Sequence, residues 1–238
     1  MTLVAPDAKL LAAYLLEDNL RKLLSVLCVL AAFTFCANAA VITLTFEGLQ
    51  DGESVNDFYN GGTGSLGSAG PNYGISFTSD SLAIISQAAG GGGNFDGAPT
   101  MPTILYFLTG AGDTMNVAAG FDTGFSFYYS SPFYTGSVLV YDGLGGTGTL
   151  LATLTLPLTP SGGAGCSGTY AYCPWEPFGV AFSGVAKSAV FSGVANYIGF
   201  DNVTLGSGIP TGGVPEPATL AITGLGIVAL ALVRRRRE

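Results

Sequence analysis

Histidine is absent from this chain of 238 residues. Histidine is the commonest general base and proton shuttle in enzymes, and it is one of the commonest zinc ligands. Its absence excludes the Ser-His-Asp and Cys-His mechanisms of catalysis, because both need an imidazole that accepts the proton of the nucleophile. Acid-base chemistry that uses two carboxylates stays open.

Basic residues are scarce as well, and most of them lie near the two ends. The chain has eight Lys and Arg residues and sixteen Asp and Glu residues. Between residues 41 and 213 it has one basic residue, Lys187, and eleven carboxylates. Because phosphate groups bind to Lys and Arg, this composition excludes nucleic acid as a partner. We expect the acidity to keep an exported protein soluble, with attraction of divalent cations as the alternative.

The carboxylates do not by themselves indicate an enzyme. Glycoside hydrolysis needs two carboxylates that face each other across a cleft, and a domain with eleven acids always offers some pair. No motif in the sequence selects one pair over the others. We therefore predict no catalytic residues and no enzymatic activity, and a glycoside hydrolase is kept only as the least favoured alternative.

The first 40 residues, 1–40, have the features of an export leader. Arg21 and Lys22 precede an apolar run of thirteen residues, 23–35, and small residues follow it in 36–40 (CANAA). This order predicts a cleaved secretory signal peptide. The apolar run is shorter than the roughly 20 residues of a membrane span, and an uncleaved membrane anchor is the alternative. The residues before the basic pair are either an extended leader or lie upstream of the true start of translation.

The C-terminal segment, 214–238, predicts a membrane anchor. Residues 218–233 form an uncharged, mostly apolar stretch of sixteen residues. As a helix this stretch would span about 24 Å, close to the ~30 Å of a bilayer's hydrocarbon core. Pro215 and Pro217 prevent a helix from beginning earlier and keep the chain around them extended. Four arginines follow the apolar stretch, and the positive-inside rule places them in the cytoplasm. They are Arg234, Arg235, Arg236 and Arg237.

This order of a Pro-Glu-Pro triplet (Pro215, Glu216, Pro217), an apolar helix and an arginine tail resembles the PEP-CTERM sorting signal of Gram-negative bacteria. The resemblance implies recognition by exosortase, a membrane cysteine protease or transpeptidase, with Glu216 as the recognised residue. Processing at the motif would release the chain from a transient inner-membrane anchor to the cell surface or the extracellular space. Such systems accompany exopolysaccharide and biofilm formation, so the resemblance also implies exopolysaccharide as a partner.

Residues 41–206 predict a single all-β domain, and the Gly-rich residues 207–213 predict a linker. The domain alternates β-branched and aromatic residues with Gly, Ser and Thr, which favours short strands joined by turns. About ten such segments favour an antiparallel β-sandwich of the jelly-roll type. They are residues 41–46, 73–78, 82–86, 103–108, 123–130, 136–142, 149–156, 178–184, 187–193 and 197–205. Segments such as 46–49 (FEGL) and 198–205 (IGFDNVTL) also resemble the body of a subgroup of PEP-CTERM surface proteins.

Cys166 and Cys173 are the two cysteines outside the predicted leader. In an exported chain, two cysteines this close together favour a disulfide that closes a loop. A loop of this size gives at most about 2–3 kcal/mol of stabilisation in the chain-entropy model. A metal site at this pair is disfavoured, because no third Cys or His accompanies them.

Glu47, Asp201 and Asn202 form a candidate calcium site. Glu47 follows the first predicted strand, and the other two lie in the last one. The first and last strands of a jelly roll often pair, and many carbohydrate-binding modules of this fold hold a structural Ca²⁺ between an early Glu and a late Asp. Oxygen ligands without histidine suit Ca²⁺. The alternative is that Asp201 and Asn202 cap a turn while Glu47 is solvated. We predict no other cofactor.

Aromatic residues in two loops form a candidate glycan-binding surface, since sugar rings stack on aromatic side chains. The candidates are Tyr134, Tyr172 and Trp175. The alternative is that such rings face the core, because strands send neighbouring side chains to opposite faces. The sequence therefore supports an exported surface or extracellular-matrix protein, with a carbohydrate-binding module of jelly-roll fold as the alternative function.

Overall fold

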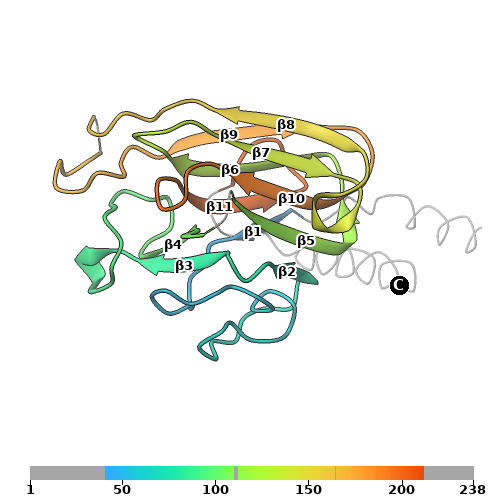
Figure 1. Ribbon diagram of the computed structural model, residues 1–238, viewed down its shortest axis with the longest axis horizontal. Helices are drawn as coiled ribbons and strands as arrows, with labels where there is room; N and C mark the ends of the chain where they lie inside the picture. The colour runs from blue at the N-terminus through green and yellow to red at the C-terminus, as the bar shows by residue number, and fades with distance from the viewer. Residues whose placement is uncertain (1–40, 110–111, 164, 212–238) are drawn as a thin grey trace, which may run out of the picture. The chain divides into compact units, whose positions relative to one another are not determined.

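The computed structural model describes residues 41–109, 112–163 and 165–211 (Figure 1). The predicted leader, the sorting motif and the apolar C-terminal helix lie outside these residues. Among the residues that are described, no helix has the length and apolar character needed to span a membrane.

The described residues form an all-β unit with two antiparallel sheets, which confirms the predicted class (Figure 1). Two short 3-10 helices, η1 (Gln87–Ala89) and η2 (Leu144–Gly146), complete the secondary structure of the described residues. The first sheet has the strand order β3 (Leu82–Ile85), β4 (Thr103–Tyr106), β11 (Gly199–Leu205), β6 (Gly124–Ser130) and β9 (Glu176–Ala181), and β1 (Ile42–Leu44) also pairs with β11. The second sheet has the order β2 (Ile75–Phe77), β5 (Gly112–Phe121), β10 (Ala186–Ser192), β7 (Gly136–Tyr141) and β8 (Leu150–Leu156).

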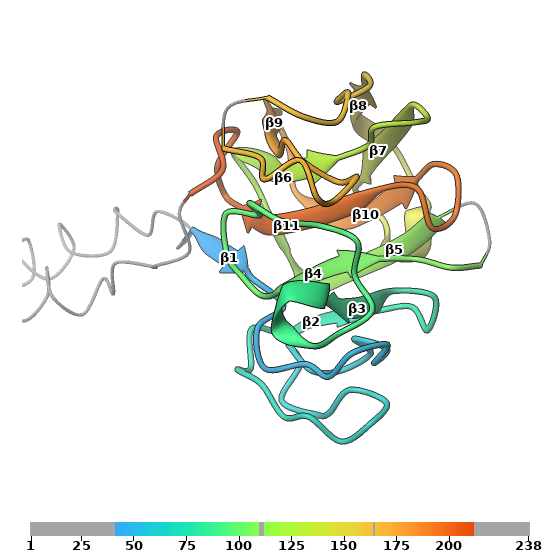
Figure 2. The ribbon, with the colours of Figure 1, turned by 90° about the vertical axis from the view of Figure 1, so that its left-hand side faces the viewer.

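The last eight strands pair in a nested order. Strand β4 pairs with β11, β5 with β10, β6 with β9 and β7 with β8, so the second half of this region runs back along the first. From β4 to β7 the chain alternates between the two sheets (Figure 2). Segments far apart in sequence therefore meet, as Leu105 and Phe200 do.

The two sheets bury a shared aromatic core. Phe125 and Phe127 of β6 and Phe200 of β11 belong to the first sheet, and Phe191 of β10 belongs to the second. The ring of Phe191 lies 4.9 Å from that of Phe200 and 6.1 Å from that of Phe125, in edge-to-face contacts. All four side chains are fully buried, and large aromatic side chains dominate the stabilisation of such cores.

Each of the ten predicted segments contains or overlaps a strand, but the longest strand, β5, was not predicted. Its sequence, GDTMNVAAGF, is rich in residues with low strand propensity. Alternate residues Asp113, Met115 and Val117 are buried, which is the two-residue period of a strand. The carboxylate among them concealed this pattern, because charged side chains are almost never fully buried.

Part of the predicted linker packs on the domain. The Ser126 hydroxyl donates to the carbonyl of Ser207 at 2.9 Å. The hydroxyls of Thr43 and Thr211 lie 2.6 Å apart, and Thr211 also accepts from the Asn202 amide at 3.4 Å. Hydrogen bonds therefore hold residues 207–211 against the first sheet.

Asp113 is a buried carboxyl without a hydrogen-bond partner among the described residues. Burial raises the pKa of Asp113 well above its usual value, and the Asp80 carboxylate raises it further; the nearby Ser81 hydroxyl, which lacks hydrogen-bonding geometry to Asp113, opposes the shift only in part. The unfolded chain loses this proton near pH 4, while the folded domain keeps it. The folded state then binds more protons, so this group makes the free energy of unfolding fall as the pH rises above about 4.

We predict that Asp113→Asn reduces this pH dependence. Chemical unfolding measured from pH 4 to 8 in a chelator should show a smaller loss of stability in the variant than in the parent protein. Asp122→Asn, which changes an exposed carboxylate, should leave the slope unchanged. Equal slopes for the parent protein and Asp113→Asn would contradict the assignment.

Candidate functional site

Pairing of the first and last strands brings the three predicted calcium ligands together. Strands β1 and β11 are antiparallel, with Leu44 opposite Val203. The residues after Leu44 therefore run beside the residues before Val203. This register brings Glu47 to the same region as Asp201 and Asn202. The expected pairing of the first and last strands is confirmed, and the calcium site itself stays a prediction.

The loop between Thr100 and Thr103 holds all three side chains. The Thr103 N–H donates to Glu47 Oε1 at 2.9 Å, and the Thr100 N–H donates to Asp201 Oδ2 at 2.8 Å. The Thr100 hydroxyl donates to Asn202 Oδ1 at 2.8 Å. Asp201 and Asn202 are fully buried, and Glu47 is half-buried. We call Glu47, Asp201, Asn202 and Thr100 the carboxylate cluster.

The backbone is strained on both sides of the carboxylate cluster. Phe46 and Asn202 have left-handed conformations, with φ of 62° and 48°, a region that bulky residues rarely adopt. The Phe46 N–H donates to the buried Tyr59 hydroxyl at 2.7 Å, which fixes this conformation. The pairing of β11 with β6 also shifts register between Asp201 and Thr204. Bulges and strained residues of this kind recur at functional sites, because they re-aim side chains.

The carboxylate cluster is poorly suited to carry two negative charges by itself. Burial raises the pKa of Asp201 to about 8; hydrogen bonds from Thr100 and Asn202 oppose this shift, and the Glu47 carboxylate adds to it. Burial also raises the pKa of Glu47, against the hydrogen bonds from Thr103. A cation beside both groups would favour their ionised forms.

The donor atoms of the carboxylate cluster fit a hard cation. They are two carboxylates, an amide oxygen and a hydroxyl, and Ca²⁺ takes such oxygens together with backbone carbonyls and water. Within the described part of the chain, no group of three or more His, Cys, Asp or Glu is placed to hold a metal. The remaining ligands of an ion here would therefore have to be neutral oxygens.

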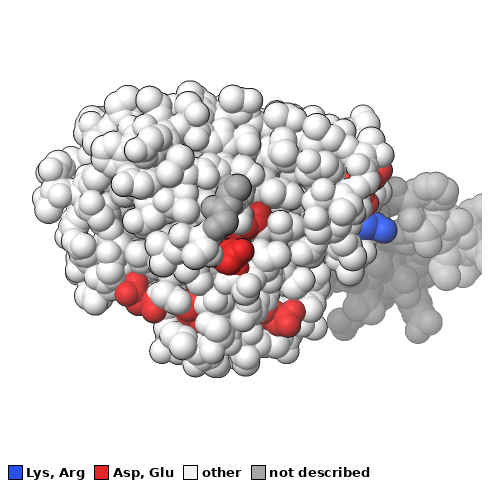
Figure 3. Space-filling view, in the orientation of Figure 1, with Lys and Arg blue, Asp and Glu red and all other residues white. Residues whose placement is uncertain are grey.

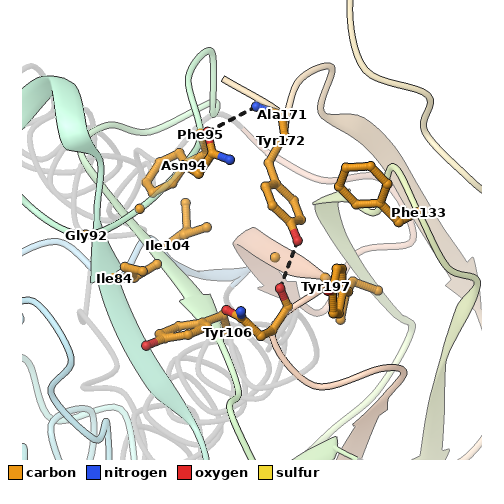
Figure 4. A pocket seen from close by; sticks show the side chains of 14 residues that line it. Ile84, Gly92, Asn94, Phe95, Ile104, Tyr106, Phe133, Ala171, Tyr172 and Tyr197 are labelled. Carbon is orange, nitrogen blue, oxygen red and sulfur yellow. Dashed lines mark hydrogen bonds between the residues drawn. The ribbon is translucent and has the colours of Figure 1, made fainter. Parts of the chain in front are cut away.

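A second candidate is a cleft with a volume of about 330 Å³, lined by aromatic residues (Figure 4). One wall contains Asn94 and Phe95, with Ile84 and Ile104 from β3 and β4. Figure 4 shows the rings of Tyr172, Phe133 and Tyr197 on the opposite side. The remaining lining residues are Gly92, Gly93, Tyr106, Ala171, Asn196, Ile198 and Gly199. We call this feature the aromatic cleft.

The disulfide predicted from the sequence is present beside the aromatic cleft. Cys166 and Cys173 are bonded, with their Cα atoms 5.7 Å apart. Tyr172, adjacent to Cys173, is joined to the opposite wall by a hydrogen bond from its N–H to the Asn94 carbonyl at 3.2 Å. The Tyr172 hydroxyl donates to the Asn196 carbonyl at 2.8 Å. Tyr172 therefore has a fixed position in the cleft.

The structure places the three residues predicted to contact a glycan in three different surroundings. Tyr172 lines the aromatic cleft. Tyr134 does not line it, but its ring lies 4.8 Å from the ring of Tyr197 and is exposed. Trp175 packs against Phe95 in a small buried cluster and is only 8% exposed. The ring of Trp175 therefore supports the wall of the cleft instead of forming a surface for stacking.

Four residues of the aromatic cleft were not predicted as site residues: Tyr106, Tyr197, Asn94 and Asn196. Tyr106 and Tyr197 lie in segments that were predicted as strands, and both asparagines occur in turn-like sequence. The pairing of β4 with β11 and the packing of the two loops before these strands bring these four residues together. Their aromatic and amide character was the available signal, but nothing in the sequence indicated that they would meet.

Comparison with known proteins identifies the C-terminal segment. Residues 213–237 match the PEP-CTERM protein-sorting motif. No curated protein matches the chain. Among solved structures, the cleaved K3 adhesin domain of Lys-gingipain from Porphyromonas gingivalis is similar at 15% identity over 70% of this chain and 97% of that chain, with a TM-score of 0.33. A likeness this weak carries no argument about fold or function. The match at residues 213–237 places the chain among proteins that carry the PEP-CTERM sorting motif, as expected for an exosortase substrate.

Proposed function

We propose that this protein is exported across the inner membrane, held there transiently by its C-terminal segment, processed by exosortase, and retained at the cell surface or in the extracellular matrix with exopolysaccharide. The match of residues 213–237 to the sorting motif is the observation that carries this proposal. The predicted leader and the disulfide between Cys166 and Cys173 support export, since disulfides persist in oxidising compartments.

We infer that the described domain is a jelly-roll sandwich, which serves as a stable body for a surface protein. The nested pairing of β4 with β11, β5 with β10, β6 with β9 and β7 with β8 supports this inference. In a jelly roll, two Greek keys fold into two sheets of this kind. The shared aromatic core between the sheets is consistent with it.

We further propose that the carboxylate cluster holds a structural calcium ion. Glu47 and Asp201 would supply the charged oxygens, and Asn202 Oδ1 a neutral one. Bound calcium would favour the ionised forms of two carboxylates whose pKa values are raised by burial. The cluster ties β1, β11 and the loop at Thr100 together, so an ion here would stabilise the domain.

A carbohydrate-binding module on the same scaffold is the second candidate function, and the aromatic cleft supports it. Binding clefts are concave and mostly apolar, with a few polar groups. Glycoside hydrolysis is disfavoured at this cleft, because none of the described residues that line it is a carboxylate and the reaction needs two. We therefore propose a protein without enzymatic activity.

We predict that exosortase determines the C-terminus of the mature protein. Mass spectrometry of the protein from producing cells should show a chain that ends at or near Pro215–Pro217, located outside the cell and in the exopolysaccharide fraction. Cells without exosortase should retain the full tail in the inner membrane. Glu216→Ala should reproduce that retention, whereas Thr219→Ala, within the apolar stretch, should be processed normally. A full-length tail in cells with and without exosortase would instead indicate a permanent anchor.

We predict that calcium raises the free energy of unfolding of this protein and that Asp201→Asn abolishes the effect. An ion that binds only the folded state stabilises it by about 2.7 kcal/mol at a free concentration of 100 Kd. Thermal unfolding at pH 7 in calcium and in chelator measures the effect. Because binding displaces the proton that Asp201 keeps up to about pH 8, the effect should increase between pH 6 and 9. Asp122→Asn is the matched control, and identical melting temperatures in calcium and chelator would exclude the site.

A further inference from the structure

The rim of the aromatic cleft exposes large aromatic side chains. Phe133 is 51% exposed and Tyr197 is 38% exposed. Their rings meet edge to face at 6.0 Å, and Phe133 meets Tyr172 in the same way at 6.1 Å. Exposed aromatic groups that cluster around a cavity mark a binding surface, because a soluble domain gains nothing by leaving them in water.

The aromatic cleft is formed before any ligand arrives. Tyr172 is held by two hydrogen bonds to the backbone of the surrounding loops, and the adjacent disulfide closes the loop that carries it. On the other wall, the Asn94 Oδ1 accepts from the Ala171 N–H at 3.2 Å. A preformed site loses little conformational entropy on binding, so stacking contacts here would contribute to affinity with little offset.

The cleft also presents polar groups that can bond to hydroxyls. Asn94 uses its Oδ1 within the protein, and its amide nitrogen makes no hydrogen bond to the described residues. Burial raises the pKa of Tyr172 to about 12, with a further contribution from Tyr197, and burial also raises the pKa of Tyr106. Both phenols therefore stay neutral at physiological pH. Aromatic faces beside neutral amides and phenols match the apolar faces and equatorial hydroxyls of a sugar ring.

Charge around the cleft decides which sugars fit. None of the lining residues is charged. Two acidic residues adjoin the lining. Asp51 accepts from the N–H of the lining residue Gly92 at 3.1 Å, and Asp96 directly follows the lining residue Phe95. On the face shown in Figure 3, carboxylates are spread over the surface and basic atoms are confined to one spot. A uronate or sulfate group would therefore meet repulsion and no compensating cation.

We propose that the aromatic cleft binds an uncharged polysaccharide, with sugar rings stacked on Phe133, Tyr172 and Tyr197 and hydroxyls bonded to Asn94 and the phenols. This inference rests on the proposed association with exopolysaccharide, and it names the class of polymer and the surface that holds it. The carboxylate cluster takes no part in this recognition, because its residues do not line the cleft.

The test uses the processed protein purified from producing cells and affinity electrophoresis in gels that contain one polymer each. The neutral probes are a glucan, a galactan, a mannan and a xylan, and the acidic probes are alginate and polygalacturonate. We expect retardation by at least one neutral polymer and by neither acidic one, in calcium and in chelator alike. Tyr172→Ala and Phe133→Ala should each weaken binding about tenfold, a loss of ~1.4 kcal/mol.

Two controls separate binding from folding. Tyr73→Ala removes an exposed tyrosine outside the cleft and should bind as the parent protein does. Tyr172→Phe keeps the ring and should retain most of the affinity. If Tyr172→Phe binds as the parent protein does while Tyr172→Ala binds more weakly, stacking on the ring accounts for the lost affinity. Melting temperatures of all variants show whether the domain is intact.

The failures of the two proposals are distinguishable. Absence of binding to every neutral polymer, binding to the acidic polymers, or neutral binding that survives both alanine variants would overturn the assignment of the cleft. If the protein still co-fractionates with native exopolysaccharide in those cases, the proposed location stands without the cleft. If the parent protein is never found outside the cell, the proposed function fails whatever the gels show.

Discussion

Strand β11 is the element on which the rest of this domain depends. It pairs with β6 on one side and with β4 and β1 on the other, and all seven of its residues are buried. Its hydrogen bonds close the first sheet across more than 160 residues of sequence, since Thr43 pairs with Thr204. Both candidate sites depend on this strand. Asp201 and Asn202 lie within it, and residues 196–199, which precede or begin it, form part of the aromatic cleft.

This arrangement places backbone strain beside the proposed calcium site. A regular strand would alternate its side chains without interruption, but β11 breaks its register with β6 between Asp201 and Thr204. The positive φ of Asn202 belongs to the same irregularity. The strand pairings around Asn202 hold the backbone in this conformation. Strain of this kind persists in folded proteins when the surrounding structure fixes it. The strain is thus consistent with the proposed calcium site, which would use the buried Asp201 and the half-buried Glu47.

The sequence allowed the all-β class and the pairing of the first and last strands to be predicted, for a clear physical reason. Strand segments show a two-residue alternation, and the first and last strands of a sandwich often pair, whereas the calcium site at Glu47 and Asp201 stays a prediction. Strand β5 was not predicted, because Asp113 occupies a buried position that an apolar residue usually fills. The aromatic cleft could be predicted only in part. Tyr172 was identified, but burial decides between core and surface for aromatic side chains, and burial of Trp175 is a tertiary property. Tyr106 and Tyr197 meet Tyr172 only through loop packing, which has no local signature.

The sorting motif, the acidic composition and the cysteine pair all agree with a protein that works outside the cytoplasm. The cysteine pair offers the most direct test, because cytosolic thiols stay reduced while exported pairs oxidise. Cells that produce the protein can be quenched in acid and alkylated, and the peptides that contain Cys166 and Cys173 can then be examined by mass spectrometry. We expect the processed chain to carry the disulfide, with no free thiol at either position. Alkylated thiols at both positions in most of the cellular protein would contradict export and the proposed location at the cell surface.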